Sequence, residues 1–239
     1  MRDWERYLGL AVLGPILWLQ GKYVRRVTPK LSEAEGLREG VSGQGPVLRL
    51  LIAGDSAAAG VGALSQDQAL CGQLVQRLSK RFSVHWQLRA FIGLDSPGLQ
   101  AMLESMAAQP LDIVVLSIGV NDVTNLMAPD QWVHWQAKVA QLVQRRHHPR
   151  IIIHSAVPPM HGFAALPPPL RGFLGHWAKE MNQRLNRSLQ GETRKLFQWP
   201  DPGDVTVGLA TDGFHPGPLG YAAWAQGLAE LIEGVDFES

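Results

Sequence analysis

Short apolar runs alternate with segments of helical periodicity from residue 47 to the end of the chain. Strands are expected near 47–53, 84–91, 111–118, 150–156 and 195–199, and helices near 66–81, 97–108, 129–146, 172–189 and 217–232. This alternation is typical of βαβ units, in which parallel strands form one sheet covered by helices. Pro110 and Pro149 stand just before two of the expected strands, where each would end the preceding helix. The sequence therefore predicts an α/β fold with a parallel sheet of about five strands.

Length and composition limit both the number of domains and the class of ligand. The 239 residues suffice for one α/β domain, residues 47–239, preceded by an extension over residues 1–46. Lys and Arg total 22 against 21 Asp and Glu, so the formal charge of +1 gives no electrostatic footprint for nucleic acid. The single cysteine, Cys71, excludes an intramolecular disulfide and thiolate metal clusters. The expected partner is a small, mostly uncharged molecule.

Residues 7–21 carry no charge, are rich in Leu, Val, Ile and Trp, and are followed by a basic cluster, Lys22, Arg25, Arg26 and Lys30. As a helix this stretch would extend about 22 Å, which is shorter than a hydrocarbon core of about 30 Å. Acidic residues near the start and the missing small-residue cleavage site do not favour a cleaved secretory signal. Two alternatives remain: an apolar anchor helix that associates with a membrane through residues 7–21, or a helix packed on its own domain. The protein would then be membrane-associated or cytoplasmic. Residues 28–46, with Pro, Gly, Ser and mixed charge, are expected to form a linker.

Ser56 is the candidate nucleophile. It follows the apolar run 47–53 and precedes small residues, a context that indicates a buried strand delivering the serine onto a tight turn at the carboxyl end of the sheet. A serine hydroxyl is a poor nucleophile unless an adjacent base removes its proton. His215 is the best candidate for that base. Asp212, three residues earlier, could fold back onto the imidazole and fix its orientation, which would complete a triad.

Three hydrogen-bond donors could stabilise the oxyanion that forms during acyl transfer. They are the backbone N–H of Ser56, the backbone N–H of Gly93 and the side-chain amide of Asn121. Asn121 follows the apolar run 111–118 and should emerge at the carboxyl end of a strand. Ligands bind at that edge in open α/β sheets, so the donors and the triad are expected to meet there.

The remaining polar residues of these motifs have simpler interpretations. Asp55 and Asp122 are expected to accept hydrogen bonds from backbone N–H groups and to hold their loops in shape. His154 and His161 are seven residues apart with no third ligand evident, so a zinc site is not expected. No metal and no other cofactor is predicted.

Four clusters in fixed order carry a family resemblance: Gly54-Asp55-Ser56, Gly93, Gly119-Val120-Asn121-Asp122 and Asp212-Gly213-Phe214-His215-Pro216. Together they resemble the blocks of the SGNH hydrolases, also called GDSL esterases and lipases, over roughly residues 47 to 233. Ala57 stands where the family's shorthand name has leucine, and the block around Gly93 is less regular than usual. The resemblance implies a flavodoxin-like three-layer domain that hydrolyses esters of small or lipid-like acyl groups without a metal.

The segment 157–166 follows the fourth expected strand and lies at the same sheet edge as Ser56. Its Met160, Phe163 and Leu166 could line an acyl pocket, since loops at this edge commonly shape substrate sites. Equally, the three side chains could cap the core beneath the loop. The sequence leaves these two alternatives open.

The sequence favours a metal-independent serine ester hydrolase that acts on a lipophilic carboxylic ester, such as a lysophospholipid, a short acylglycerol or an aryl ester. A carbohydrate or peptidoglycan O-acetylesterase, or an acyltransferase of the same fold, is the alternative within enzymes. A non-catalytic, membrane-associated binding module that keeps the fold is the alternative from another class.

Overall fold

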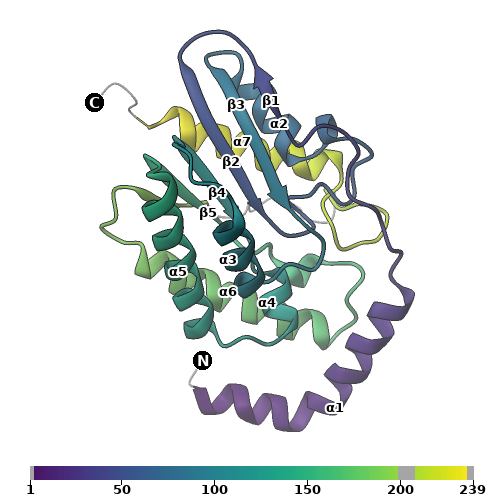
Figure 1. The fold of residues 1–239 in the computed structure, drawn as a ribbon. Helices are drawn as coiled ribbons and strands as arrows, with labels where there is room; N and C mark the ends of the chain where they lie inside the picture. The colour runs from purple at the N-terminus through teal and green to yellow at the C-terminus, as the bar shows by residue number, and fades with distance from the viewer. Residues whose placement is uncertain (1–2, 199–207, 236–239) are drawn as a thin grey trace.

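The computed structural model describes residues 3–198 and 208–235, and the side chains from residue 13 onward within those ranges. Its six-stranded sheet has the order β1-β3-β2-β4-β5-β6 (Figure 1). The strands are β1 (Glu39–Ser42), β2 (Val47–Gly54), β3 (Ser83–Ala90), β4 (Ile113–Ser117), β5 (Ile151–Ser155) and β6 (Lys195–Gln198). All pairs are parallel except β1 with β3. The five parallel strands follow the doubly wound order 2-1-3-4-5, so the predicted flavodoxin-like α/β fold is confirmed. Residue 199 of the last predicted strand lies outside the described residues.

The central strands are buried on both faces, which explains why they read as nearly continuous apolar runs. In β2, Leu50 and Ile52 join one hydrophobic cluster, whereas Leu51 and Ala53 join the cluster on the opposite face. Successive side chains of a strand point to opposite faces, so the helices on both sides of the sheet pack against side chains of the same central strands. Each fully buried aliphatic side chain contributes about 1.5–3 kcal/mol.

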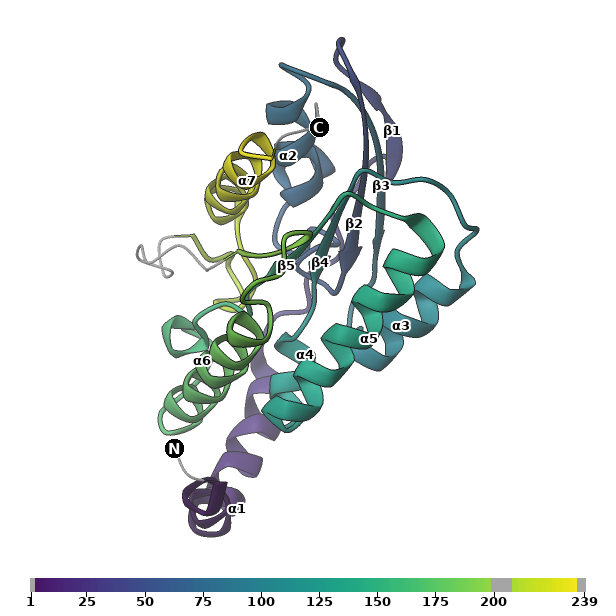
Figure 2. The same cartoon turned by 90° about the vertical axis from the view of Figure 1, so that its left-hand side faces the viewer.

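Helices cover both faces of the sheet (Figure 2). The helices α2 (Leu70–Leu78) and α7 (Pro218–Glu233) pack on one face, and α3 (Ser96–Ser105) and α5 (Pro129–His147) pack on the other. The helix α6 (Leu170–Ser188) packs against α5 and the short helix α4 (Val120–Thr124). A 3-10 turn, η1 (Gln66–Gln68), precedes α2 within the helix expected over 66–81. Proline at the start of α3, α5 and α7 suits a first helical turn, where its missing N–H costs nothing.

The strand β1 lies inside residues 28–46, which were expected to be a linker. It pairs antiparallel with the outer edge of β3. Next to it, the N–H of Leu88 donates to Arg38 O at 2.7 Å, and Arg38 Nη1 donates to Ala90 O at 2.8 Å. This segment is therefore part of the sheet, and it covers the edge that β3 would otherwise expose.

The helix α1 (Asp3–Val27) contains the predicted apolar stretch 7–21 and is longer than it at both ends. It lies on the side of the molecule toward which β2 and β3 run, and it is bent (Figure 1). Pro15 lies inside it, where proline removes one helical hydrogen bond and commonly causes a bend.

The helix α1 also contacts the rest of the domain. Leu17 and Val24 are buried in the cluster that includes α6, and Gln20 exchanges hydrogen bonds with Pro168 O and the N–H of Leu170 at 2.8 and 3.1 Å. No helix in the described ranges is both long enough and apolar enough to cross a membrane. In the structure α1 packs on its own domain.

Candidate active site

Three loops leave the sheet side by side because β2, β3 and β4 end at the same level. Gly54 is the register partner of both Ala90 and Ser117, the last residues of the neighbouring strands. The N–H of Asp55 then donates to Ser117 O at 3.1 Å, which continues the pairing by one step. A Cβ atom on Gly54 would overlap that same carbonyl oxygen, so only glycine allows this close approach. Ser56, Gly93 and Asn121, the last in the short helix α4, therefore lie on segments that leave one edge of the sheet.

Ser56 lies on the tight turn that the sequence predicts. The N–H of Ala59 donates to Asp55 O at 2.9 Å, and the N–H of Val61 donates to Ser56 O at 3.0 Å. Ala58 and Ala59 are fully buried under the turn, which has no room for larger side chains there. The Oγ of Ser56 lies 3.0 Å from Nε2 of His215. The structure thus brings together two residues that are 159 positions apart in the chain.

Asp212 and His215 share a short loop that folds the carboxylate onto the imidazole. Gly213 has a φ of 64°, a left-handed conformation that favours glycine in such a turn. The Oδ1 atom of Asp212 accepts hydrogen bonds from the N–H groups of Phe214 and His215 at 2.9 and 3.0 Å, and Oδ2 lies 2.6 Å from Nδ1 of His215. An ionised carboxylate only accepts, so we assign the proton of neutral His215 to Nδ1. The lone pair on Nε2 then faces the hydroxyl of Ser56.

The surroundings of Asp212 keep it ionised. Burial alone would raise its pKa, but the hydrogen bonds from His215 and from the N–H of Phe214 outweigh that effect and hold the pKa below its usual value. The carboxylate is therefore charged at neutral pH. It can stabilise a positive charge on the imidazole when His215 takes up a proton.

Asp55 has the opposite electrostatic character, although it is the neighbour of Ser56. Its side chain is 2% exposed, and Oδ1 accepts a hydrogen bond from the N–H of Ala57 at 3.0 Å. Burial raises its pKa to about 7, against the smaller opposing effects of that hydrogen bond and of nearby His215. The carboxyl group thus supports the turn of Ser56 and titrates near neutral pH.

Asp55 should make the free energy of unfolding fall as the pH rises. The folded protein holds its proton more tightly than the unfolded chain, so stability is lost between about pH 4, the unfolded pKa, and pH 7. A difference of about three pH units corresponds to about 4 kcal/mol. The Asp55→Asn variant has no carboxyl group at this position, so it should not lose this stability as the pH rises. The free energy of unfolding of the variant minus that of the unmodified protein should therefore increase by about 3 kcal/mol from pH 5 to pH 8. Urea denaturation at the two pH values measures this, with Asp67→Asn at an exposed position as the control. Equal pH dependence in all three proteins would contradict the assignment.

Asp122 holds the loop of Asn121 against the loop of Gly93. Its Oδ1 and Oδ2 atoms accept hydrogen bonds from the N–H and the hydroxyl of Ser96 at 3.1 and 2.8 Å. Asn121 adds a second link, because its Nδ2 donates to Leu94 O at 2.8 Å. One of the two amide hydrogens of Asn121 is thereby used, and the other remains for a ligand. Gly93 is exposed, and a Cβ placed on it would contact nothing within 4 Å, so the space beside it is open.

A buried polar chain that the sequence did not reveal continues from Ser96 into the core. Gln136 Nε2 donates to Ser96 Oγ at 3.3 Å, and Gln136 Oε1 lies 3.1 Å from Nδ1 of His154. Burial lowers the pKa of His154 to about 4, so this histidine is neutral. Its only sequence signal was a histidine inside an apolar strand. In the described ranges, no three His, Cys, Asp or Glu side chains gather as they would around a metal ion.

A cavity of about 960 Å³ opens beside Ser56 and His215. Its walls are the carboxyl ends of β4, β5 and β6, the segment after β5 and one side of α7, and most of its side chains are apolar. Of the three residues proposed for an acyl pocket, only Phe163 lines it. Met160 and Leu166 are buried in the cluster with α6, as the core-capping alternative describes. Gly93 and Asn121 are not among the described residues that line the cavity.

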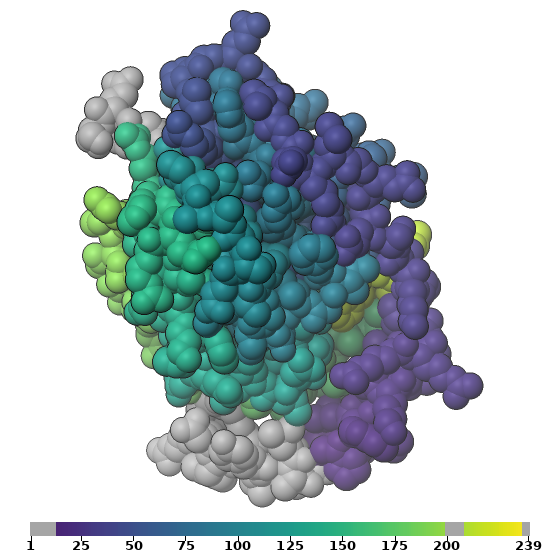
Figure 3. Space-filling view, viewed as in Figure 1, coloured from purple at the N-terminus to yellow at the C-terminus, as the bar shows by residue number. Residues whose placement is uncertain are grey.

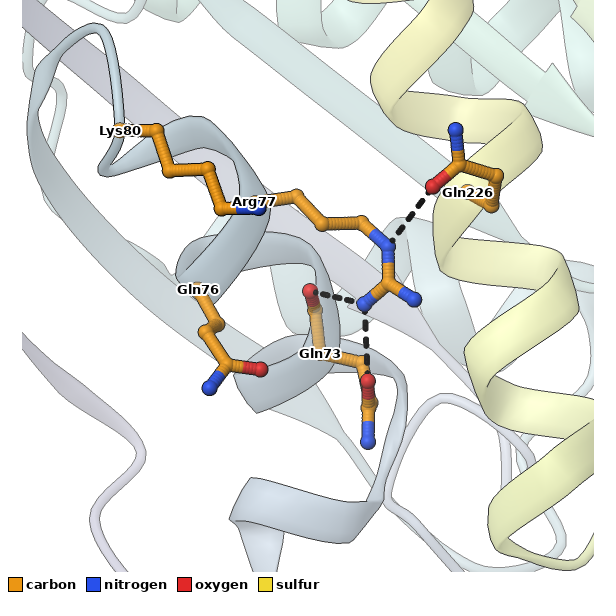
Figure 4. A pocket seen from close by; sticks show the side chains of 5 residues that line it. All are labelled: Gln73, Gln76, Arg77, Lys80 and Gln226. Carbon is orange, nitrogen blue, oxygen red and sulfur yellow. Dashed lines mark hydrogen bonds between the residues drawn. The ribbon is translucent and has the colours of Figure 1, made fainter.

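A second, smaller hollow of about 330 Å³ lies between α2 and α7 and is lined only by polar side chains (Figure 4). Arg77 dominates it. The guanidinium donates to the main chain and side chain of Gln73 at 2.9 and 2.8 Å, and to Oε1 of Gln226 at 3.1 Å. These bonds tie the two helices together, so the hollow has a structural explanation.

The model of the GDSL-like lipase/acylhydrolase family matches residues 52–223. No curated protein matches the sequence. Among solved structures, a lipase from a goat rumen metagenome has a TM-score of 0.63 at 16% identity, and covers 77% of this chain and 96% of its own. A G-D-S-L family lipolytic protein from Veillonella parvula has a TM-score of 0.62 at 15% identity, with 79% and 100% covered.

An acetylxylan esterase from Geobacillus stearothermophilus, solved as a catalytic mutant, has a TM-score of 0.60 at 17% identity, with 81% of this chain and 97% of its own covered. At such identities these structures establish the shared fold. The family match covers well over half of the chain and includes the loops of Ser56 and His215. The chain therefore belongs to the GDSL-like lipase/acylhydrolase family and is a carboxylic ester hydrolase.

Proposed function

We propose that the protein hydrolyses lipophilic carboxylic esters through an acyl-enzyme on Ser56. The observation that carries this proposal is the hydrogen-bonded line from Ser56 Oγ to His215 Nε2, at 3.0 Å, and from His215 Nδ1 to Asp212 Oδ2, at 2.6 Å. A nucleophile within hydrogen-bond reach of a base that a third group orients is the arrangement used in nucleophilic catalysis.

In the proposed reaction, Ser56 Oγ attacks the acyl carbon while His215 Nε2 takes the hydroxyl proton. The tetrahedral intermediate collapses, the ester C–O bond breaks, and His215 returns the proton to the leaving alcohol. A water molecule then attacks the acyl carbon and gives a proton to His215. The bond between that carbon and Ser56 Oγ breaks, His215 returns the proton to Oγ, and the carboxylic acid leaves. Asp212 stays ionised throughout and stabilises the charged imidazole.

For the oxyanion we propose three donors: the N–H of Ser56, the N–H of Gly93 and the second amide hydrogen of Asn121. Their loops share one sheet edge, and the links from Asp122 to Ser96 and from Asn121 to Leu94 hold two of these loops together before substrate binds. Donors fixed in advance need no reorganisation as the charge develops, and each contributes on the order of 3 kcal/mol.

The cavity supports a lipophilic substrate. Its volume of about 960 Å³ lies at the upper end of the range for small-molecule sites, and its walls are mainly apolar. Kinetics on p-nitrophenyl esters of increasing acyl length test this preference. We expect kcat/KM to rise from acetate to longer chains. Activity confined to acetate would instead favour the O-acetylesterase alternative, to which the acetylxylan esterase neighbour draws attention.

We also propose that α1 docks on an anionic lipid surface. Trp18, Leu19 and Tyr23 are about 60% exposed, and they are interspersed with the exposed cations Lys22, Arg25 and Arg26. The space-filling view shows the α1 segment projecting at the rim of the molecule (Figure 3). Exposed aromatic and aliphatic side chains beside cations are typical of helices that lie in a membrane interface. Since α1 lies on the side of the sheet's carboxyl edge (Figure 1), docking would bring the candidate site toward the lipid.

Co-sedimentation with vesicles tests this docking. The protein should bind phosphatidylglycerol-containing vesicles more strongly than phosphatidylcholine vesicles, and binding should weaken at high salt. A variant with Trp18, Leu19 and Tyr23 all replaced by serine should bind at least tenfold more weakly. Leu64→Ser, at an exposed leucine outside α1, should bind normally. Equal binding to the two vesicle types would contradict the proposal.

A further inference from the structure

We propose that the cavity is a groove for a medium-length to long fatty acyl chain, which runs from Ser56 along one side of α7. This inference rests on the proposed hydrolase function and adds the direction and length of the bound chain. The cavity reaches from Ser56 and His215 to Glu230 and Leu231, near the carboxyl end of α7. Its long dimension therefore follows that helix.

The near end of the groove is fixed at the candidate site. Helix α7 begins three residues after His215, and its Tyr221 hydroxyl donates to Val61 O at 2.7 Å. Val61 in turn closes the turn of Ser56 through its N–H. The first turn of α7 is thereby held near the nucleophile, and this helix forms one wall of the space open to a chain attached to Ser56.

Among the residues of α7 that line the cavity, five form one stripe: Leu219, Gly220, Ala223, Gly227 and Leu231. Their spacing of about four residues places them on one face of the helix. Twelve residues separate Leu219 from Leu231, which corresponds to about 18 Å along the axis. An extended hydrocarbon chain advances about 1.25 Å per carbon for bonds of about 1.5 Å. The stripe is thus as long as an acyl chain of about 14 carbons.

Small residues keep the middle of the stripe open. Ala223 is exposed to the cavity, and Gly227 has no side chain. A Cβ on Gly227 would meet a single atom within 4 Å, Nε2 of Gln198 at 3.0 Å, which is the far end of a flexible side chain. A longer side chain at either position would therefore project into the groove.

Several polar side chains along the groove hydrogen-bond to one another, which favours a hydrocarbon over a sugar. Trp224 Nε1 donates to Ser155 Oγ at 2.9 Å and to Gln198 Oε1 at 2.8 Å, and Gln198 Nε2 donates to Trp224 O at 3.2 Å. Near the outer end, Gln226 Nε2 donates to Glu230 Oε1 at 2.8 Å. The hydroxyl groups of a sugar would compete with these pairs for the same donors and acceptors, whereas a methylene chain needs no partner.

Two leucine substitutions test the direction of the chain. Kinetics are measured on monomeric p-nitrophenyl esters from acetate to palmitate, and kcat/KM is expected to rise about fourfold for each methylene that becomes buried. In the unmodified protein the rise should continue to about 14 carbons. Gly227→Leu should end the rise at shorter chains and lower kcat/KM on myristate at least tenfold. Ala223 lies one helical turn closer to Ser56. In Ala223→Leu, kcat/KM should therefore stop rising at an acyl chain about five carbons shorter than in Gly227→Leu.

Controls separate this inference from the proposed function. Gly172→Leu places the same side chain at a helical glycine with open space around it, outside the groove, and should keep the chain-length profile of the unmodified protein. If the unmodified protein and both groove variants had identical chain-length profiles, the proposed acyl groove would be wrong. Activity of the unmodified protein on acetate would in that case still support the proposed ester hydrolysis. Absence of activity on every ester would overturn the proposed function itself. If Gly227→Leu fails to fold, the profile of Ala223→Leu alone decides.

Discussion

Replacing Ser56 with alanine is expected to lower kcat for ester hydrolysis by on the order of 10⁶. The change removes the oxygen that attacks the substrate and the partner of His215 Nε2 at 3.0 Å. The backbone of the turn should persist, because its hydrogen bonds involve main-chain atoms and the carboxyl group of Asp55. Initial rates on a p-nitrophenyl ester, with thermal unfolding of the same sample, measure both effects.

The matched control is Ser105→Ala, at an exposed serine whose hydroxyl bonds only to its own helix, at Met102 O. It should retain full activity. A Ser56→Ala protein that is folded and still turns over within a factor of ten of the unmodified enzyme would mean that another group attacks the ester.

Replacing Asp212 with asparagine is expected to lower kcat by about 10⁴ while leaving the fold intact. The Asn oxygen can still accept the N–H groups of Phe214 and His215, so the loop should keep its shape. The new amide would present hydrogens to Nδ1 of His215, which turns that nitrogen into an acceptor. The ring proton then moves to Nε2, which faces Ser56 and no longer has a lone pair to accept the hydroxyl proton.

Asp67→Asn provides the matched control for the loss of a carboxylate, at an exposed position in η1. It should leave kcat unchanged. If Asp212→Asn lost less than tenfold in kcat, Asp212 would not be the group that sets the tautomer of His215.

The parts of this protein that the sequence predicted are those that local patterns determine. The central strands β4 and β5 are apolar runs buried on both faces, and α3, α5 and α7 each have a proline in the first turn. The motif residues Ser56, Asp212 and His215 were identified from residue type and spacing. Their meeting across 159 positions follows once strand order brings the ends of the sheet together.

The features that the sequence did not predict depend on contacts between distant segments. The strand β1 has only four residues in a Gly- and Ser-containing segment, and its pairing with β3 supplies its stability. The sequence left open whether Met160 and Leu166 line a pocket or cap the core, because only their packing with α6 decides between the two. The chain from Ser96 to His154 joins two helices and a strand through hydrogen bonds between side chains.

The proposed reaction requires that His215 activates the hydroxyl of Ser56 in the folded protein. Labelling with a fluorophosphonate probe, followed by mass spectrometry of the peptides, tests it most directly because no substrate need be assumed. We expect one adduct on Ser56, which should be absent from Ser56→Ala and from protein unfolded in urea. A folded protein that takes up no probe, or that carries the probe on a different residue, would contradict it.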